Sequence, residues 1–317
     1  MPMPSLQPSI KIKSFMTNLK KMHAQRGQES IKVLFNKSEG KHLLFLTSSS
    51  DMGVIRNNGR NGAKYAPRSF LFHFKKMTQD HDLKNWRFTE VEVSSQEAEK
   101  KNFVEAQRLE TKKIVDASPL KHQFICHVGG GHDHIYPLVT ALKNDFSKVI
   151  IVNIDAHADT RTDEEFHSGT PFRQLDSEIN NFKVYQIGLH PYANSFSTLK
   201  PLKQEMEILW KKDCHEANIQ SFFKKINSEV NPNTLVIFSL DADALSGHQV
   251  PGVSAVNVDG LELDQIKNIM NQYLNLSFSH PPILGIYELN PVYDHLSGVS
   301  MSTTANFLFT TIKSLKG

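Results

Sequence analysis

Short apolar runs alternate with amphipathic segments along most of the chain. The near-continuous apolar runs predict strands that are buried on both faces, as in a parallel sheet. These runs are His42–Thr47, Gln123–Val128, Val149–Ile154, Val184–Gly188, Thr234–Leu240 and Ile283–Tyr287. Apolar positions at helical spacing predict helices over Ser95–Asp116, Asp133–Asp145, Glu216–Ser228, Leu263–Leu274 and Thr303–Lys316. The alternation predicts an α/β fold, a single doubly wound three-layer domain with a mainly parallel β-sheet.

The first 30 residues have a different pattern, because they are basic and polar. We expect residues 1–30 to form a peripheral N-terminal segment and residues 31–317 to form the α/β domain. The 317-residue chain is 39% hydrophobic and 22% charged, which is typical of a globular protein.

Charge and cysteine content argue against several classes of protein. The chain has 36 basic and 33 acidic residues and a formal net charge of +3, without the basic stripe that is typical of nucleic-acid binders. No apolar run approaches the roughly 18 residues of a membrane span. The two cysteines, Cys126 and Cys214, suit a reducing compartment. We therefore expect a cytoplasmic protein with no nucleic-acid or membrane partner.

Polar segments follow four of the predicted strands, at the point where each strand ends. They are Gly129-Gly130-Gly131-His132-Asp133-His134, Asp155-Ala156-His157-Ala158-Asp159, Asp241-Ala242-Asp243 and Glu288-Leu289-Asn290-Pro291. In an open parallel sheet, the carboxyl ends of neighbouring strands border one crevice, where ligands bind. The sequence therefore predicts that His, Asp and Glu side chains from separate segments meet at one wall.

Four carboxylates in a partly buried crevice repel one another unless they bind protons or cations. The four are Asp155, Asp159, Asp241 and Asp243. Two divalent cations would balance their charge, and the neutral imidazoles of His132 and His157 would complete the coordination. Asp155 and His157 lie two residues apart, as do Asp241 and Asp243, and the members of each pair point the same way if the backbone stays extended. Mixed carboxylate and imidazole ligands suit Mn²⁺ or a similar metal, and two such ions can activate one bridging water.

Each motif also has an ordinary structural interpretation. An isolated Asp-x-Asp is usually a turn or a helix cap, and a run of glycines is usually a tight turn. A single His after a strand is more often a hydrogen-bonded core residue than a ligand. Cys126 and His127 form a poor nucleophilic pair, because adjacent strand residues point to opposite faces. The coincidence of several such motifs at strand ends favours a functional site over these interpretations.

Three of these segments resemble the signature motifs of the ureohydrolase superfamily, which comprises arginases, agmatinases and formimidoylglutamases. The matching motifs are Gly130-Gly131-His132-Asp133, Asp155-Ala156-His157-Ala158-Asp159 and Ser239-Leu240-Asp241-Ala242-Asp243. Further matching segments are Gly59–Ala63 with Pro67 and Arg68, Ser168–Phe172, Pro251–Ala255, and Glu288–Pro291 with Asp294. The resemblance spans roughly residues 53 to 295 in the family's order, and it implies an arginase-like fold.

Within the superfamily, the chain is most similar to formimidoylglutamases. The segments that carry this similarity are Gly129–His132, Asp241–Ser246 with Pro251–Ala255, and Gly188–Ser195. Asp133 stands where these enzymes often have Glu, and His190 stands where Gln is common. Phe172 occupies the region in which arginases place a proton-shuttling His, which argues against an arginase. The roles of His134, His167 and His190 are left open by the resemblance.

The resemblance implies two Mn²⁺ ions per subunit. The first would be bound by His132, Asp155, Asp159 and Asp241. The second would be bound by Asp155, His157, Asp241 and Asp243, so that Asp155 and Asp241 bridge both ions. Asp159 would also carry a proton to the leaving nitrogen, and Glu288 would orient the cationic amidine.

The implied activity is that of a hydrolase acting on C–N bonds of linear amidines. Its substrate would be N-formimidoyl-L-glutamate, which water cleaves to L-glutamate and formamide in histidine degradation. The carboxylates of this small molecule need donors, for which Arg60, Arg173 and Asn194 are candidates. The alternatives are an agmatinase or another guanidino-acid ureohydrolase, a single-zinc deacetylase, and a non-catalytic metal-binding metabolite sensor. The resemblance also implies a homo-oligomer, either a trimer or a hexamer.

Overall fold

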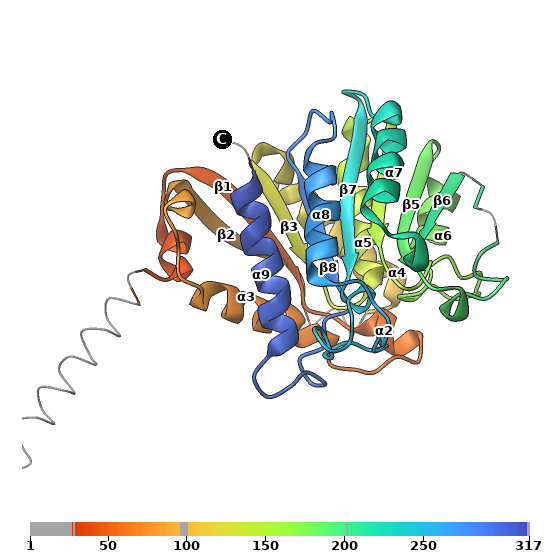
Figure 1. Ribbon diagram of the computed structural model, residues 1–317, viewed down its shortest axis with the longest axis horizontal. Helices are drawn as coiled ribbons and strands as arrows, with labels where there is room; N and C mark the ends of the chain where they lie inside the picture. The colour runs from red at the N-terminus through yellow and green to blue at the C-terminus, as the bar shows by residue number, and fades with distance from the viewer. Residues whose placement is uncertain (1–26, 28, 96–100, 201, 204, 316–317) are drawn as a thin grey trace, which may run out of the picture.

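One parallel sheet runs through the middle of the computed structural model, which describes residues 27, 29–95, 101–200, 202–203 and 205–315 (Figure 1). In this described part, the sheet has eight strands in the order β2-β1-β3-β8-β7-β4-β5-β6. Each strand pairs in parallel with its neighbours. The strands are β1 (Lys41–Ser48), β2 (Trp86–Ser94), β3 (Phe124–Val128), β4 (Lys148–Ile154), β5 (Phe182–Leu189), β6 (Glu205–Trp210), β7 (Thr234–Asp241) and β8 (Ile283–Tyr287).

Helices cover both faces of the sheet, so the molecule has three layers (Figure 1). One face carries α3 (Ala66–Lys76), α7 (Glu216–Glu229), α8 (Leu263–Leu274) and α9 (Val299–Ser314). The other face carries α4 (Phe103–Asp116), α5 (Ile135–Leu142) and α6 (Pro171–Glu178), and the short α2 spans Met52–Arg56. Short 3-10 helices are η1 (Ile31–Asn36), η2 (Ala63–Tyr65), η3 (Asp82–Asn85), η5 (Pro119–Lys121), η6 (His132–His134), η7 (Lys143–Asp145), η8 (Pro191–Ala193), η9 (Lys211–Asp213) and η10 (Ala242–Ala244). The predicted three-layer α/β fold is confirmed.

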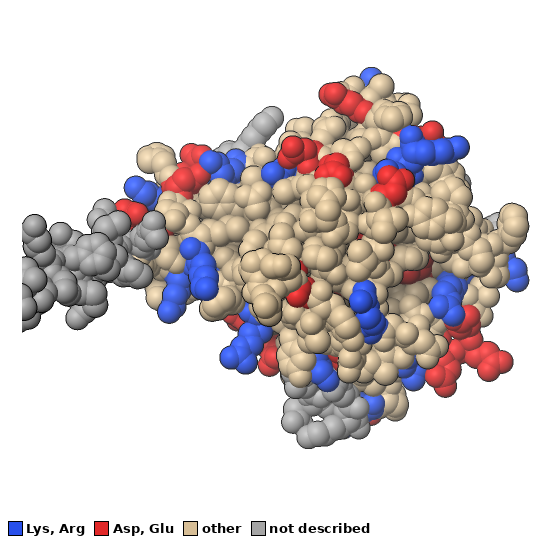
Figure 2. All heavy atoms as spheres, turned by 60° about the horizontal axis from the view of Figure 1, so that its bottom comes forward, with Lys and Arg blue, Asp and Glu red and all other residues tan. Residues whose placement is uncertain are grey.

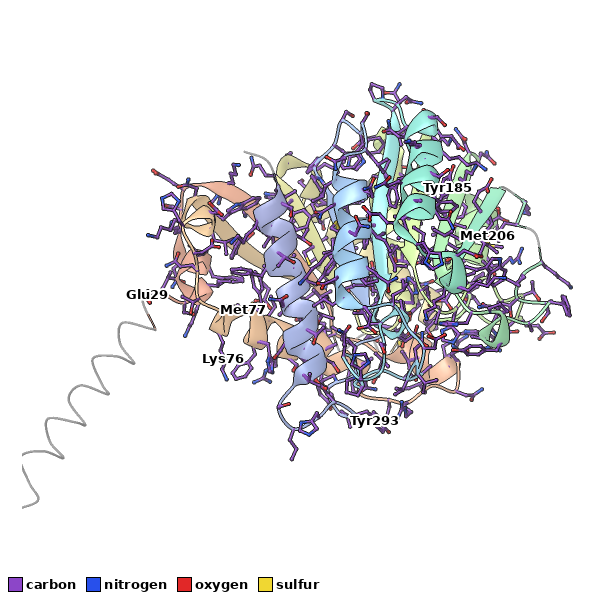
Figure 3. The ribbon with its side chains drawn as sticks, viewed as in Figure 1. Glu29, Lys76, Met77, Tyr185, Met206 and Tyr293 are labelled. Carbon is purple, nitrogen blue, oxygen red and sulfur yellow. The ribbon has the colours of Figure 1, made fainter. Side chains whose placement is uncertain are left out.

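The core consists of two apolar layers, because each face of the sheet packs against helices. Successive residues of β4 point to opposite layers: Ile150 belongs to the cluster beneath α7, α8 and α9, and Ile151 belongs to the cluster beneath α5 and α6. Tyr185 points from β5 towards α7, where its ring contacts Phe222 edge-on at 5.4 Å between ring centroids (Figure 3). Burial on both faces explains why the central strands are almost wholly apolar.

All six predicted strands are present, and each of their ends lies within two residues of the predicted position. The apolar pattern does not predict β2 and β6, which are the two edge strands. In β2, the buried Trp86 and Phe88 alternate with the more exposed Arg87 and Thr89. An edge strand is less completely covered than a central one, so it lacks the continuous apolar run by which the other strands are recognised.

The helix boundaries depart further from the prediction. The helix predicted over Ser95–Asp116 is α4, which begins at Phe103, after Asn102 caps it by accepting a hydrogen bond from the Glu105 N–H (2.8 Å). Residues 96–100 of that prediction lie outside the described residues. The predicted Asp133–Asp145 helix is divided into η6, α5 and η7, and α9 begins before the predicted Thr303. The pattern also fails to predict α3 and α6.

Two further observations concern the outer parts of the chain. Residues 1–26 and 28 of the predicted peripheral segment lie outside the described residues, so the boundary at residue 30 stays a prediction. No helix among the described residues is long and apolar enough to cross a bilayer. Acidic and basic side chains are interspersed over the face shown in Figure 2.

The strand order brings the four polar segments of the sequence together. β3, β8, β7 and β4 are consecutive neighbours in the middle of the sheet, and each runs into one of these segments at its carboxyl end. The register pairs Val128 with Ile286, Ile286 with Leu240, and Leu240 with Ile154, so the four strands end level with one another. Side chains that follow these strands therefore meet at one edge of the sheet.

Candidate metal centre

A buried imidazole lies among three carboxylates at this edge. His132 Nδ1 is 2.8 Å from Asp159 Oδ2, 3.1 Å from Asp155 Oδ2 and 3.2 Å from Asp241 Oδ2. One potential ligand atom from each of these four residues lies within 4.8 Å of the others, so the group could hold a metal ion.

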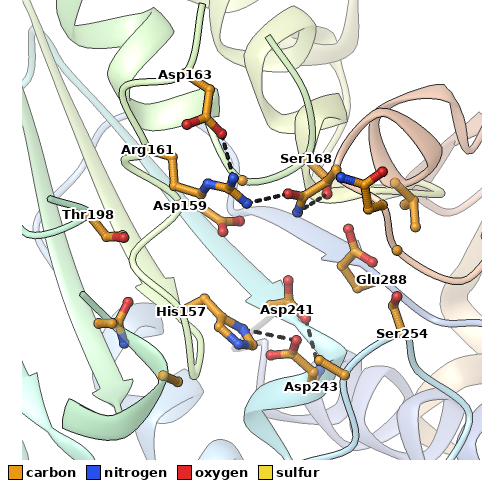
Figure 4. A pocket seen from close by; sticks show the side chains of 18 of the residues that line it. His157, Asp159, Arg161, Asp163, Ser168, Thr198, Asp241, Asp243, Ser254 and Glu288 are labelled. Carbon is orange, nitrogen blue, oxygen red and sulfur yellow. Dashed lines mark hydrogen bonds and ion pairs between the residues drawn. The ribbon is translucent and has the colours of Figure 1, made fainter. Parts of the chain in front are cut away.

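A second group of potential ligands adjoins the first. His157 Nδ1 lies 3.1 Å from Asp243 Oδ2 and 3.7 Å from Asp155 Oδ1 (Figure 4). These three residues also meet the spacing that a metal ion requires. Asp155 belongs to both groups, with one oxygen directed to each. The structure therefore brings together all six of the ligands predicted from the sequence.

Asp155, which follows β4, and Asp241, which ends β7, form the same local turn. Asp155 Oδ1 accepts a hydrogen bond from the His157 N–H at 2.7 Å, and Asp241 Oδ1 accepts one from the Asp243 N–H at 2.9 Å. The carboxylate thereby folds the chain back over itself, as in an Asx turn. The prediction that residues two apart share a direction because the backbone stays extended is wrong in its reason, since after Asp241 the chain enters η10.

The protonation of these groups reflects their crowding. Burial, together with the charges of Asp243 and Asp155, holds the pKa of Asp241 well above its usual value. Burial and the charge of Asp155 raise the pKa of Asp159 to about 6. Burial alone would lower the pKa of His132, but its close contacts with the carboxylates of Asp155 and Asp159 raise it well above 6.5. Without cations, the cluster therefore retains protons that bound cations would replace.

Unpartnered polar atoms test whether a metal fits these residues. His132 Nδ1 and Asp243 Oδ1 are buried and make no hydrogen bond of standard geometry to the described residues. The other ring nitrogen of His132 lies 2.8 Å from Ser239 Oγ, which leaves Nδ1 free to act as a ligand. Oxygen and nitrogen donors without thiolates suit manganese or a similar divalent ion. The residues present fit such a metal pair.

A cavity of about 640 Å³ opens over both groups (Figure 4). Glu288 forms part of its lining, and the Glu288 Oε1 atom accepts a hydrogen bond from the His132 N–H at 3.0 Å. Burial, with the nearby charges of Asp243 and Asp159, raises the pKa of Glu288 to about 8. Glu288 thus lies beside the candidate metal groups, as the sequence predicted.

The three predicted contacts for the substrate's carboxylates have other partners. The guanidinium of Arg60, which lines the cavity, donates to the carbonyl oxygens of Ser254 and Val253 and lies over the Tyr293 ring. Arg173 donates to the carbonyl oxygens of Thr160 and Lys200. It is not among the described residues that line the cavity. Asn194 lines the cavity, but its amide oxygen accepts from the Ala158 N–H and its amide nitrogen donates to the Ala156 and His190 carbonyls.

Arg161 is a cavity residue that the sequence interpretation did not single out. Its guanidinium donates to Asn57 Oδ1 at 2.6 Å and forms an ion pair with Asp163 at 2.6 Å (Figure 4). Hydroxyl groups from Ser168 and Thr198 line the same mouth. Arg161 follows Asp159 by two residues, and this proximity to a strand-end motif was the signal that could have identified it.

The structure gives partners to the histidines whose roles were open. His134 Nδ1 pairs with Glu110 at 2.8 Å, and the charges of Glu110 and Asp133 outweigh burial and raise the pKa of His134 to about 10. His167 Nε2 lies 2.7 Å from Asp163. The His190 ring packs at 4.7 Å from that of Tyr192 between centroids.

Phe172 and Cys126 both lie in the core. Phe172 is fully buried, and its ring meets the His132 imidazole edge-on at 5.4 Å between centroids. Cys126 is a fully buried strand residue, and burial raises the pKa of its thiol, so it is an inert core residue.

The chain is similar in sequence and in fold to known proteins. A sequence model of the Arginase family matches residues 47–313. The formimidoylglutamase of Macrococcus caseolyticus is 27% identical over 266 residues, which are 82% of this chain and 80% of that protein. The crystal structure of Trypanosoma cruzi formiminoglutamase with Mn²⁺ has a TM-score of 0.73 at 20% identity, over 91% of this chain and 99% of that chain. The Bacillus subtilis formimidoylglutamase structure has a TM-score of 0.75 at 18% identity, over 88% of both chains.

Proposed function

This chain belongs to the arginase family, and we propose that it hydrolyses a C–N bond of a linear amidine with the help of two manganese ions. The substrate in this proposal is N-formimidoyl-L-glutamate, and the products are L-glutamate and formamide. The observation that carries the proposal is the pair of ligand groups that share Asp155 beneath one cavity. The likeness to formimidoylglutamases supports the choice of substrate.

Each ion has its own ligand set in this proposal. His132, Asp155, Asp159 and Asp241 hold the first ion, and Asp155, His157, Asp241 and Asp243 hold the second. Asp155 has oxygens directed to both groups, which suits a bridging ligand. When bound, the pair of divalent ions supplies a water nucleophile that is deprotonated near neutral pH.

Asp159 and Glu288 are the residues of the chain that act on the amidine. Asp159 has Oδ2 directed to the first ligand group; its other carboxylate oxygen takes the proton that the attacking water loses and passes it to the leaving nitrogen as the C–N bond breaks. Glu288 lies on the cavity wall beside it and accepts hydrogen bonds from the cationic amidine, which orients the reacting carbon. Both side chains are buried at the base of the cavity, where interactions with charge are strong.

Arg161 replaces the predicted arginines as the principal contact for the substrate's carboxylates. Its guanidinium lies at the mouth of the cavity with Ser168 and Thr198 close by, and Arg binds carboxylates through two parallel hydrogen bonds. Arg60 and Arg173 have guanidinium groups committed to backbone carbonyls, whereas the partners of the Arg161 guanidinium are two side chains, Asn57 and the exposed Asp163. Arg60 and Arg173 therefore support the walls of the cavity.

Phe172 favours a formimidoyl substrate over a guanidino substrate. It fills the arginase shuttle region and packs on His132, so no imidazole at this position protonates a strongly basic leaving amine. The α-amino group of glutamate is a weaker base than the side-chain amine that leaves from arginine or agmatine. The acid provided by Asp159 is therefore sufficient for glutamate.

Product analysis after manganese loading tests the proposal. Formamide should form from formimidoylglutamate, with little urea from arginine, agmatine, guanidinobutyrate or guanidinopropionate. Efficient release of urea from agmatine, with formimidoylglutamate inert, would make the protein an agmatinase. No turnover of any substrate would favour a metabolite sensor, and one tightly held zinc per chain would favour a deacetylase.

A further inference from the structure

An aromatic ring lies directly beneath the imidazole of the first ligand group. The rings of Tyr287 and His132 are stacked, with centroids 5.1 Å apart and an angle of 24° between their planes. Both side chains are fully buried. Tyr287 is the last residue of β8, so the ring is anchored in the middle of the sheet. The face of His132 therefore rests on a rigid part of the molecule.

Two glycines make room for this tyrosine. A Cβ on Gly285 would lie 2.5 Å from the Tyr287 ring, and a Cβ on Gly129 would lie 2.7 Å from it. Gly285 stands inside a fully buried strand, where glycine is normally unfavourable. Gly129 is the first residue of the glycine run that leads to His132. A side chain at either position would collide with the Tyr287 ring, so both positions require glycine.

The hydroxyl group of the tyrosine is fixed by a buried chain of hydrogen bonds. Tyr287 Oη lies 3.0 Å from His127 Nδ1, and His127 Nε2 lies 2.8 Å from Ser48 Oγ. Ser48 Oγ in turn donates to Glu110 Oε1 at 2.6 Å. This chain links β8 to β3, β1 and α4. Rotation of the Tyr287 ring would break it and would leave buried polar groups without partners, which is costly.

We propose that Tyr287 is a positioning residue that fixes the direction of the His132 imidazole within the first ligand group. The Tyr287 ring supports one face of His132, and the Phe172 ring meets it edge-on. Ser239 Oγ holds Nε2, so the remaining nitrogen, Nδ1, faces the carboxylates. The inference deepens the proposed function and rests on it, because it concerns the binding of one of the two ions.

The imidazole of the second ligand group is less enclosed than that of the first. The His157 side chain is 34% exposed, whereas that of His132 is fully buried. Tyr287 contacts the imidazole of the first group. Loss of its ring should therefore weaken the binding of the first ion and leave the binding of the second almost unchanged. This asymmetry separates a positioning role from a general contribution to stability.

Manganese titration of Tyr287 variants tests the inference. Tyr287→Met fills much of the volume but has no planar face, and we expect one of two Mn²⁺ ions to bind about 10- to 100-fold more weakly. Tyr287→Phe keeps the ring and should restore affinity to within about threefold of wild type. The readouts are metal content, calorimetric titration and the electron paramagnetic resonance signal of the coupled manganese pair.

Tyr273 provides a matched control. Its ring is also fully buried, and its hydroxyl lies 3.1 Å from the carbonyl oxygens of Val236 in β7 and Ile283 in β8, where it can donate to either. Tyr273→Met should lower the thermal midpoint without changing either manganese affinity. If Tyr287→Met does not fold, Gly285→Ala displaces the ring while leaving it present, and the same selective loss is expected.

The outcomes separate this inference from the proposed function. Wild-type protein that binds no manganese would overturn both. Two ions bound with unchanged affinity by wild type and by Tyr287→Met would overturn the positioning role alone. Equal weakening of the first ion in Tyr273→Met and Tyr287→Met would also overturn it, because the effect would then come from general loss of packing.

Discussion

Asp159 and Glu288, which follow different strands, both have left-handed backbone conformations, with φ of 51° and 61°. This conformation costs a non-glycine residue about 1–2 kcal/mol. Hydrogen bonds hold each residue in place: the Asp159 carbonyl accepts from the Phe172 N–H, and the Glu288 N–H donates to the Gly130 carbonyl at 2.7 Å. Strained residues that face one cavity are typical of functional sites. The proposed proton donor and the proposed orienting residue are thus both held in this conformation, as is Asn58 (φ 58°), which also lines the cavity.

Glu288→Gln should stabilise the metal-free protein at pH 8. The pKa of Glu288 is raised from 4.5 to about 8, chiefly by burial, so the carboxyl group destabilises the fold increasingly as pH rises through this window. The amide can still accept a hydrogen bond from the His132 N–H. We expect the thermal midpoint of the variant to rise by about 2–4 °C at pH 8 and to match wild type near pH 4.

The same variant should lose most of its activity while keeping its manganese. Glu288 is proposed to contact the amidine, whereas the metal groups consist of other residues. A lower thermal midpoint at pH 8, or loss of bound manganese together with activity, would contradict this account of Glu288.

Asparagine substitutions of Asp155 and Asp241, the two residues proposed to bridge, should affect the binding of both ions. Asp155→Asn and Asp241→Asn should weaken both manganese ions by about 10-fold or more, because each removes a charged contact. Asp243→Asn should weaken one ion, since Asp243 groups only with Asp155 and His157. Metal content after dialysis against a graded series of Mn²⁺ concentrations distinguishes the variants.

Asp51→Asn is the control for these substitutions. Asp51 is a fully buried carboxylate that accepts the Gly62 N–H at 2.6 Å, and it lies outside both ligand groups. The Asp51→Asn protein should bind both manganese ions with the affinity of wild type. In the structure, Asp241 belongs to the group that contains His132 and not to the group that contains His157. Loss of a single ion in Asp241→Asn would therefore show that Asp241 does not bridge the two ions.

The candidate ligands could be predicted because they immediately follow recognisable strands. Asp155 and Asp241 each end a continuous apolar run, and parallel topology places such ends together. The turn geometry was not predictable in the same way. It depends on backbone N–H groups that bond to the Asp155 and Asp241 carboxylates, and an alternating spacing alone is equally compatible with extended chain.

The substrate contacts were harder to predict because a basic side chain gives no sign of its partner. Arg60 binds the carbonyls of Val253 and Ser254, which are distant in sequence. Arg173 likewise binds the carbonyls of Thr160 and Lys200. Only the folded chain shows that these two guanidinium groups bond to backbone carbonyls, whereas that of Arg161, at the cavity, bonds to the side chains of Asn57 and Asp163.

Glu229 offers a test of stability far from the cavity. Its carboxylate accepts hydrogen bonds from Lys148 (2.8 Å), Lys183 (2.7 Å) and Tyr185 (2.6 Å). Burial alone would raise the pKa of Glu229, but these three donors outweigh burial and lower it from 4.5 to about 2. The stabilisation is therefore fully present above pH 4.5 and is lost as pH falls through about 2.

Glu229→Gln should lower the free energy of unfolding by about 1–2 kcal/mol at pH 7. The difference from wild type should shrink steadily below pH 4.5. Urea denaturation at several pH values measures it, and a difference that persists unchanged at pH 2.5 would mean that the charge of Glu229 is not its source. Manganese binding should be unaffected.

Arg161→Met should raise KM for formimidoylglutamate by about 10- to 100-fold, the value of one hydrogen bond between charged groups. The expected change in kcat is small, because Arg161 lies at the mouth of the cavity and is proposed to contact the substrate away from the reacting carbon. Arg173→Met is the matched control: its guanidinium ties Thr160 to Lys200, so the variant should lose thermal stability with little change in KM. Steady-state kinetics of both variants decides between the two arginines. A large rise in KM for Arg173→Met, with Arg161→Met unchanged, would return the carboxylate contact to the residue first suggested by the sequence.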